Sequence, residues 1–326
     1  MASIGLAVAV GAALALAGQW LRAPRVCAYG RVGWAGLGVF GGCAAILASP
    51  LSEHAAVGTL AWTGYVLAVD AAVFALRGRS LLRSRPDALL WLAVLSVFLW
   101  LPFEWYNLRL AGWYRSGLPP NLLRYLLLGW SFACVWPALL ETADLLLALF
   151  FNNSRRHDPT RPPGLSLACG IAATGAILLL APLAVPRLDL GEYLLPLASA
   201  GFLLLLEPWN AMVGRTGLWL QARSGNYSLP AALAGAGLFC GLWLDALNYL
   251  SRSKWHSLWT FTSAGTLFEL PWAAYAVLPL FGWQAFAMYQ FAAGLLNLPR
   301  SELGSLCARA VAGQVANRAR ASPPAL

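Results

Sequence analysis

Charged residues are scarce in this chain. Asp, Glu, Lys and Arg make up 11% of its 326 residues, whereas soluble domains carry about 25%. Hydrophobic residues make up 60%, and the mean hydropathy is +0.64. A soluble core cannot absorb repeated apolar runs of about 18 residues or more. The composition therefore excludes an ordinary soluble domain and predicts an all-α, polytopic transmembrane helix bundle.

The signatures of several common chemistries are also missing. The sequence has no GxxxxGK[ST] loop, no HExxH pair and no GxSxG setting, and its three histidines all lie between apolar runs. These absences disfavour ATP hydrolysis, zinc hydrolysis and haem electron transfer. The six cysteines are scattered without a CxxC pair. We therefore expect no metal, no cofactor and no disulfide framework.

What is present is a series of apolar segments, each long enough to cross about 30 Å of hydrocarbon. They lie near residues 3–20, 32–48, 57–76, 87–103, 122–150, 165–185, 190–206, 229–250 and 267–297. The last run holds Pro271 and Pro279, so it is either one kinked span or a re-entrant hairpin followed by a span. We prefer one kinked span, which gives about nine spans in all.

The formal net charge of +9 could suggest a nucleic-acid partner. Its basic residues instead lie between the apolar runs, which is how a membrane protein sets its orientation. Counted along the nine runs, 16 of the 22 basic residues fall on one side. This bias predicts an inner (cytoplasmic) membrane protein with its N-terminus outside and its C-terminus in the cytoplasm. We therefore expect membrane lipids, and no nucleic acid, as partners.

A short phrase occurs twice in the sequence. Glu104-x-x-Asn107 precedes Trp113, Glu207-x-x-Asn210 precedes Trp219, and a Cys follows each Trp at the same spacing. Each copy belongs to three spans, so the phrase predicts an inverted repeat of the kind found in secondary transporters. The resulting divisions are two N-terminal spans (1–56), repeat 1 (57–151), a basic loop (152–164), repeat 2 (165–250), a kinked span (251–298) and a cytoplasmic tail, expected to be disordered (299–326).

Polar residues inside or at the ends of the apolar runs are the candidate site. A charged residue there costs about 2.5–3.5 kcal/mol on insertion, so such residues usually face the bundle interior. The substrate-binding or proton-coupling candidates are Glu104, Asn107, Glu141, Asp144, Glu207, Asn210, Asp245, Asn248 and Glu269, and the cavity-lining candidates are Trp136, Trp243 and Trp272. Alternatively, each polar group bonds a neighbour and holds helices together.

Two resemblances add to this interpretation. The segments VDAAVFALRGRSLL, WLPFEWYNLRLAGW, CVWPALLET and TLFELPW resemble a family of prokaryotic polytopic membrane proteins, which implies a multi-span fold and no particular activity. Pro137-Ala-Leu-Leu-Glu141 is similar to the Pro-x-Glu-Glu motif in the three-span units of membrane lycopene cyclases. The doubled acid of that motif is absent here.

Three functions fit these observations. The first is a transporter-like protein that binds a small apolar or cationic molecule at an interior carboxylate, Asn and Trp site, coupled to protons through Glu141 or Glu269. The second is a cofactor-free enzyme acting on a lipid or isoprenoid, with Glu141, Asp144 or Glu269 as general acid. The third is a structural subunit of a larger membrane complex.

Overall fold

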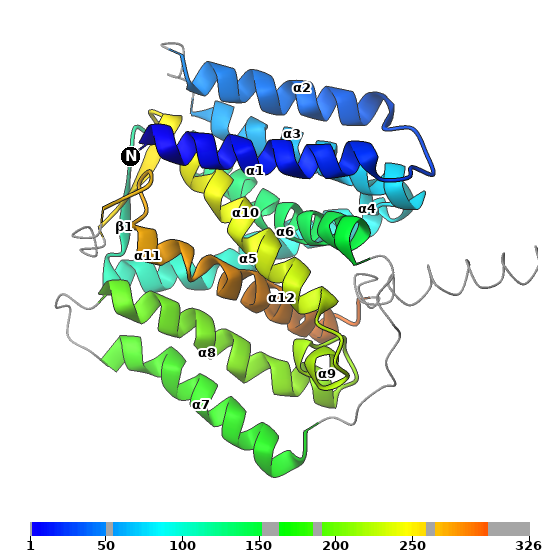
Figure 1. The fold of residues 1–326 in the computed structure, drawn as a ribbon. Coiled ribbons are helices and arrows are strands. Elements are labelled where there is room, and N and C mark those ends of the chain that lie inside the picture. Colours follow the sequence, from blue (N-terminus) through cyan, green and yellow to red (C-terminus); the bar gives the residue numbers. More distant parts are fainter. Residues whose placement is uncertain (1, 50–54, 152–162, 185–190, 259–264, 299–326) are drawn as a thin grey trace, which may run out of the picture.

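Each of the nine apolar runs of the sequence contains a long helix, and Figure 1 shows how these helices are arranged. A computed structural model describes residues 2–49, 55–151, 163–184, 191–258 and 265–298. The expected tail, residues 299–326, and nearly all of the expected basic loop, residues 152–164, lie outside the described residues.

The described elements follow one another as long helices joined by short helices and strands. The long helices are α1 (Ala2–Arg22), α2 (Gly30–Leu47), α3 (Ala56–Arg77), α5 (Pro86–Leu110), α6 (Leu122–Phe150), α7 (Leu165–Ala184), α8 (Gly191–Met212), α10 (Ser228–Leu250) and α12 (Leu278–Leu295). The short elements are α4 (Leu81–Ser84), β1 (Trp113–Ser116), α9 (Leu218–Arg223), β2 (Lys254–Ser257) and α11 (Trp272–Tyr275).

The predicted all-α fold is confirmed, and its helices have the character of membrane spans. Seven of them (α1, α2, α3, α5, α6, α7 and α10) are long and apolar enough to cross a membrane. In the most apolar 18-residue stretch of α1, 11% of the residues are buried. A helix that is apolar on its outer faces suits contact with lipid rather than with water.

The segment near residues 267–297 differs from the expected single kinked span. Pro271 is the N-cap of α11, and α12 begins only at Leu278, with Pro279 in its first turn. A proline in the first turn of a helix costs little, because the N–H that it lacks would have no partner there. The two prolines therefore mark two helix starts and not a kink within one helix.

The chain contains two units, α2–α6 (the first unit) and α7–α12 (the second unit), whose elements follow the same order except that the second has one more short helix, α11. Each unit opens with two long helices that cross at a pair of glycines. A Cβ on Gly36 would lie 2.8 Å from the carbonyl oxygen of Gly64, and a Cβ on Gly175 would lie 2.8 Å from that of Gly201. Small residues of this kind let two helix backbones approach closely.

An acid follows the second glycine of each pair at the same spacing and binds the next short helix. Asp70 accepts a hydrogen bond from the N–H of Leu82 in α4, at 2.8 Å. Glu207 accepts one from the N–H of Trp219 in α9, at 3.1 Å. Each donor lies 12 residues after its acid. Both carboxyl groups thus satisfy N–H groups at a helix start, which have no partner within the helix itself.

In each unit, an asparagine near the end of a long helix bonds the backbone of the strand that follows. The side-chain amide of Asn107, near the end of α5, bonds both the N–H and the carbonyl oxygen of Trp113 in β1, at 2.9 and 2.9 Å. Asn248, near the end of α10, bonds the N–H and the carbonyl oxygen of Trp255 in β2 in the same way, at 2.9 and 2.8 Å. Each strand is therefore held to the helix that precedes it.

The two units run in the same direction. Strands β1 and β2 pair with each other in antiparallel register, Trp113 opposite Ser257 and Ser116 opposite Lys254. The ends of α5 and α10 that lead into them must therefore lie at one end of the bundle, called the strand end. Figure 1 shows α4 and α9 at the opposite end.

This arrangement does not support the expected inverted repeat. That repeat matched Glu104 with Glu207, whereas the residue equivalent to Glu207 in the first unit is Asp70. Asn210 also differs from Asn107, because its amide donates to the carbonyl oxygen of Ala287 in α12 and not to a strand. The two copies of the Glu-x-x-Asn phrase therefore stand in unrelated settings.

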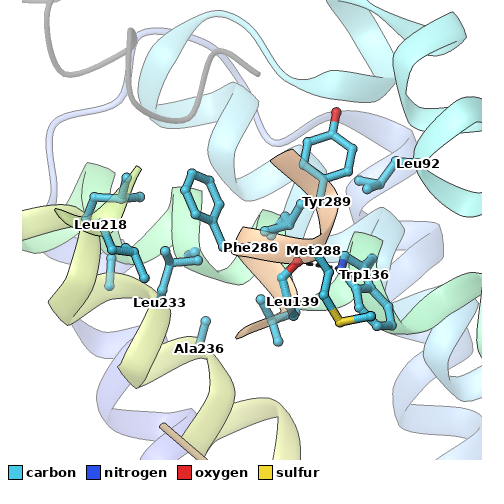
Figure 2. Close-up of a cluster of buried hydrophobic side chains, with 14 of the residues drawn as sticks. Leu92, Trp136, Leu139, Leu218, Leu233, Ala236, Phe286, Met288 and Tyr289 are labelled. Atoms are coloured by element: carbon cyan, nitrogen blue, oxygen red, sulfur yellow. Dashed lines mark hydrogen bonds between the residues drawn. The ribbon is translucent and has the colours of Figure 1, made fainter. Parts of the chain in front are cut away.

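The largest hydrophobic core lies where the two units meet (Figure 2). Trp136 of α6 is fully buried there, and its Nε1–H donates to the carbonyl oxygen of Ala285 in α12, at 2.8 Å. Leu233 of α10 and Phe286 of α12 belong to the same cluster. Helix α6 of the first unit is thus packed against α10 and α12 of the second.

Candidate ligand cavity

A cavity of about 310 Å³ lies between the two units, within the range of about 300–1,000 Å³ typical of ligand pockets. Its walls come from α3, α5, α6, α10 and α12. Most of the lining is apolar, for example Val135 and Leu139 of α6, Leu247 of α10 and Phe281 of α12. Glycines on α3 and α10, at positions 58, 237 and 241, supply part of the wall without side chains.

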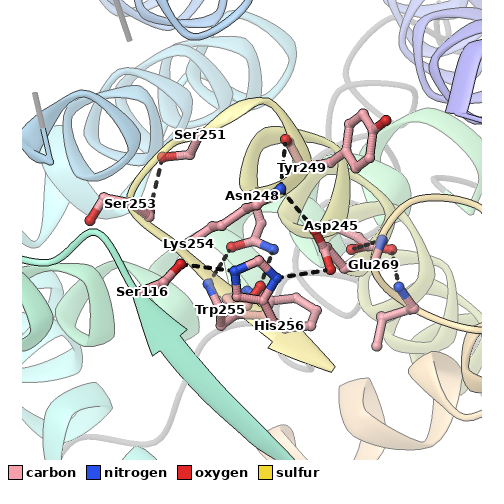
Figure 3. Close-up of polar contacts among 11 residues, drawn as sticks. Ser116, Asp245, Asn248, Tyr249, Ser251, Ser253, Lys254, Trp255, His256 and Glu269 are labelled. Atoms are coloured by element: carbon pink, nitrogen blue, oxygen red, sulfur yellow. Dashed lines mark hydrogen bonds and ion pairs between the residues drawn. The ribbon is translucent and has the colours of Figure 1, made fainter. Parts of the chain in front are cut away.

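Polar lining residues gather at the strand end of this cavity. They come from β1, β2 and the last turn of α10 with the residues that follow it: Arg115, Asn248, Ser251, Ser253, Lys254 and Trp255. Figure 3 shows how the members near β2 lie around the end of α10. We call Arg115, Ser253 and Lys254 the donor group. The cavity therefore has a long apolar part and a polar end.

Two ion pairs fix the strands at the polar end. Both Nη atoms of Arg115 bind the Glu104 carboxylate, at 2.8 and 2.6 Å. The Nζ of Lys254 lies 2.9 Å from Oε1 of Glu269, and the Nδ1 of His256 lies 3.5 Å from its Oε2. The two basic side chains line the cavity, whereas Glu104 and Glu269 do not. The charged groups that face the cavity are therefore cationic.

The carboxylates expected to share one pocket are distributed over separate places instead. Of the nine polar candidates, all within the described part of the chain, Asn248 alone lines this cavity. Asp245 accepts hydrogen bonds from the N–H groups of Glu269 and Leu270, at 3.2 and 3.1 Å, and from the hydroxyl of Tyr275, at 2.5 Å. It thereby holds the segment before α11 against α10.

One group of acids does gather, near α4. The carboxyl groups of Glu141 and Asp70 lie close to each other, and Asp144 forms an ion pair of 2.6 Å with Arg77. The Ser80 hydroxyl also donates to Asp70, at 2.8 Å. Glu141 is 2% exposed, and its Oε1 has no hydrogen-bond partner among the described residues. We call Asp70, Arg77, Glu141 and Asp144 the acid cluster.

The tryptophans named from the sequence do not line the cavity either. Trp136 lies in the core, Trp243 packs with its ring centroid 5.4 Å from that of Phe40, and Trp272 is 41% exposed. The tryptophans that do line it are Trp62, Trp100 and Trp255. Trp62 and Trp100 were not predicted from the sequence. Arg115 and Lys254 were counted there only among the basic residues on the side of the membrane that has fewer of them.

The donor group had a sequence signal that could have found it. Arg115 lies two residues after Trp113, and Lys254 directly precedes Trp255. Each of these tryptophans is bonded by the asparagine of the preceding helix. The acid-x-x-Asn phrase that precedes each strand is Glu104-x-x-Asn107 in one unit and Asp245-x-x-Asn248 in the other. Matching these two copies places both cations at the same end of the bundle.

Searches for a matching family model, curated protein or solved structure find none. Among the described residues, no group of three or more His, Cys, Asp or Glu could hold a metal ion. Glu141, the acid of the cyclase-like segment, belongs to the acid cluster and does not line the cavity.

Proposed function

We propose that this chain is a multi-pass protein of the cytoplasmic membrane that binds a small apolar molecule between its two units and carries it across or within the membrane. The observation that supports this most is the apolar cavity between the units. Because no carboxylate of the described residues lines that cavity, its chemistry favours an apolar ligand over a cationic one. An acid-catalysed reaction is less well supported for the same reason.

The topology belongs to the same proposal. We propose that all nine long helices span the membrane, with the N-terminus outside and the C-terminus in the cytoplasm. Arg22 ends α1, Arg77 ends α3 and Arg223 ends α9. These helix ends lie on the side that the charge count assigns to the cytoplasm. The strand end, with fewer basic residues, then faces outward.

Filling the cavity is expected to abolish transport. Gly58 lines it, and a Cβ at this position would meet no atom within 4 Å. The variant Gly58→Phe therefore places a ring in the cavity without a backbone clash. We expect transfer to be at least about tenfold slower, which corresponds to a loss of about 1.4 kcal/mol of ligand binding. The measurement is the transfer of a fluorescent long-chain dye in proteoliposomes.

Gly42→Phe is the matched control for this experiment. Gly42 on α2 also has no atom within 4 Å of a Cβ, but it does not line the cavity. It carries the same increase in side-chain size on a neighbouring helix. Equal transfer by the two variants would contradict a role for this cavity.

Proton coupling, if the transfer uses it, is expected to act through the acid cluster. Two buried carboxyl groups that lie close together do not both carry a charge at low cost, so Glu141 and Asp70 are the described groups best placed to hold a proton that exchanges. Glu269 is the weaker candidate, since it is already paired with Lys254. We expect Glu141→Gln to remove the response of transfer to a proton gradient. Transfer that still follows the gradient in Glu141→Gln would rule out this role.

A further inference from the structure

The polar end of the cavity offers hydrogen-bond donors and positive charge. Among its described lining residues the charged ones are Arg115 and Lys254. Asn248, which also lines the cavity, bonds both the N–H and the carbonyl oxygen of Trp255. A cationic head would lie beside two cationic side chains there, whereas a neutral oxygen would accept their hydrogen bonds without the added strength that a charged acceptor gives.

A buried hydroxyl at the same end has no partner. The Oγ of Ser253 is inaccessible to solvent and makes no hydrogen bond to any described residue. Its residue lines the cavity, between Ser251 and Lys254 (Figure 3). Buried polar atoms almost always have a partner, and an exception calls for an explanation. A rotation of the Ser253 side chain about χ1 would turn this hydroxyl toward a ligand oxygen at the polar end, which would then supply the missing acceptor.

The two cations keep donor capacity beyond their ion pairs. Lys254 has three N–H donors, of which contacts with Glu269 at 2.9 Å and the carbonyl oxygen of Tyr249 at 3.5 Å use two. The Arg115 and Lys254 side chains are 21% and 22% exposed, so they are neither fully buried nor fully hydrated. Charge-assisted hydrogen bonds in such a setting are stronger than neutral ones.

From these observations we infer the class of ligand: a single-chain amphiphile whose head is a carboxylate or a phosphate monoester. The head binds Arg115, Ser253 and Lys254, and the chain lies between α3, α6 and α10. This inference rests on the proposed function, because it assumes that the cavity holds the ligand. It adds the charge of the head and the direction in which the chain lies.

The experiment compares four ligands with one chain and different heads: dodecanoate, dodecyl phosphate, dodecanol and dodecyltrimethylammonium. Each competes with a brominated dodecanoate that quenches tryptophan fluorescence of the full-length protein in nanodiscs. Trp62, Trp100 and Trp255 line the cavity and report occupancy. We expect an anionic head to bind at least about tenfold more tightly than dodecanol, and the trimethylammonium head to bind most weakly. The tighter of the two anions tells a fatty acid from a phosphorylated lipid.

Variants of the donor group test the placement of the head. Ser253→Ala removes a hydroxyl that bonds no described residue, so the fold should tolerate it. Ser253→Ala and Lys254→Gln are each expected to weaken anion binding several-fold and to leave dodecanol binding unchanged, whereas Lys254→Arg restores it. Arg252→Gln removes a neighbouring charge that does not line the cavity and serves as the control.

The possible outcomes separate the two proposals. Two results would overturn the inferred head group and leave the cavity proposal intact. One is that dodecanol binds as tightly as the anions, and the other is that Ser253→Ala and Lys254→Gln bind the anions as tightly as the wild type does. If neither brominated dodecanoate nor a brominated dodecanol quenches the fluorescence, the proposed function itself fails.

Discussion

Gly282→Val is expected to destabilise the protein by about 3 kcal/mol, because it forces two closely packed helices apart. A Cβ on Gly282 of α12 would lie 2.0 Å from the carbonyl oxygen of Leu233 in α10, and a Cβ on Gly237 of α10 would lie 2.3 Å from that of Leu278. The atoms in the way are backbone atoms, which no change of rotamer can move. The two helices must therefore separate, and the core around Leu233 and Phe286 opens with them.

Reversible unfolding in mixed micelles measures this effect, with Gly38→Val as the matched control. Gly38 lies within α2, and a Cβ there would meet no atom within 4 Å. Both substitutions replace a helical glycine by the same β-branched residue, so their intrinsic helix propensities change alike. Equal stability of the two variants would show that α10 and α12 do not approach as closely as described.

Arg77→Gln is expected to cost about 3–5 kcal/mol of unfolding free energy, the usual loss when one partner of a buried ion pair is removed. Arg77 and Asp144 are 2.6 Å apart, with side chains 10% and 12% exposed. Glu141 and Asp70 adjoin this pair. Without the guanidinium, three buried acids of the acid cluster lose the cation beside them.

A double-mutant cycle distinguishes the ion pair from a general packing defect. Replacing both partners of a buried pair is often close to neutral, so Arg77→Gln/Asp144→Asn should recover much of the stability that Arg77→Gln loses. Arg85→Gln removes an arginine from an exposed pair with Asp87 at 3.2 Å and is expected to have a much smaller effect. The same loss in Arg85→Gln and Arg77→Gln, with no recovery in the double variant, would contradict the buried pair.

The positions of the long helices could be predicted from the sequence because each one is an apolar run of sufficient length. The short elements could not be, since four residues such as Trp113–Ser116 carry too little periodicity to identify a strand. The relation between the units was missed for a different reason. Its markers are an acid followed by Gly78-Arg79-Ser80 in one unit and by Gly214-Arg215-Thr216 in the other, a match less conspicuous than two copies of Glu-x-x-Asn.

The acids were expected to share a pocket because burial of a charge in an apolar run usually has a functional reason. In the structure, Asp70, Glu207 and Asp245 each accept hydrogen bonds from backbone N–H groups of a later segment. Such pairing depends on where the chain turns back, which the local sequence does not reveal. The cavity was likewise hidden, because it arises where glycines and aliphatic residues of several helices leave space.

The cavity between the two units is the centre of this account, and its occupancy is tested most directly by native mass spectrometry of the gently purified protein. We expect the wild type and Gly42→Phe to carry one tightly held chain-bearing molecule, and Gly58→Phe to carry none. Retention of the same molecule by Gly58→Phe would contradict the account, because the ring at position 58 would then occupy space that the ligand does not use.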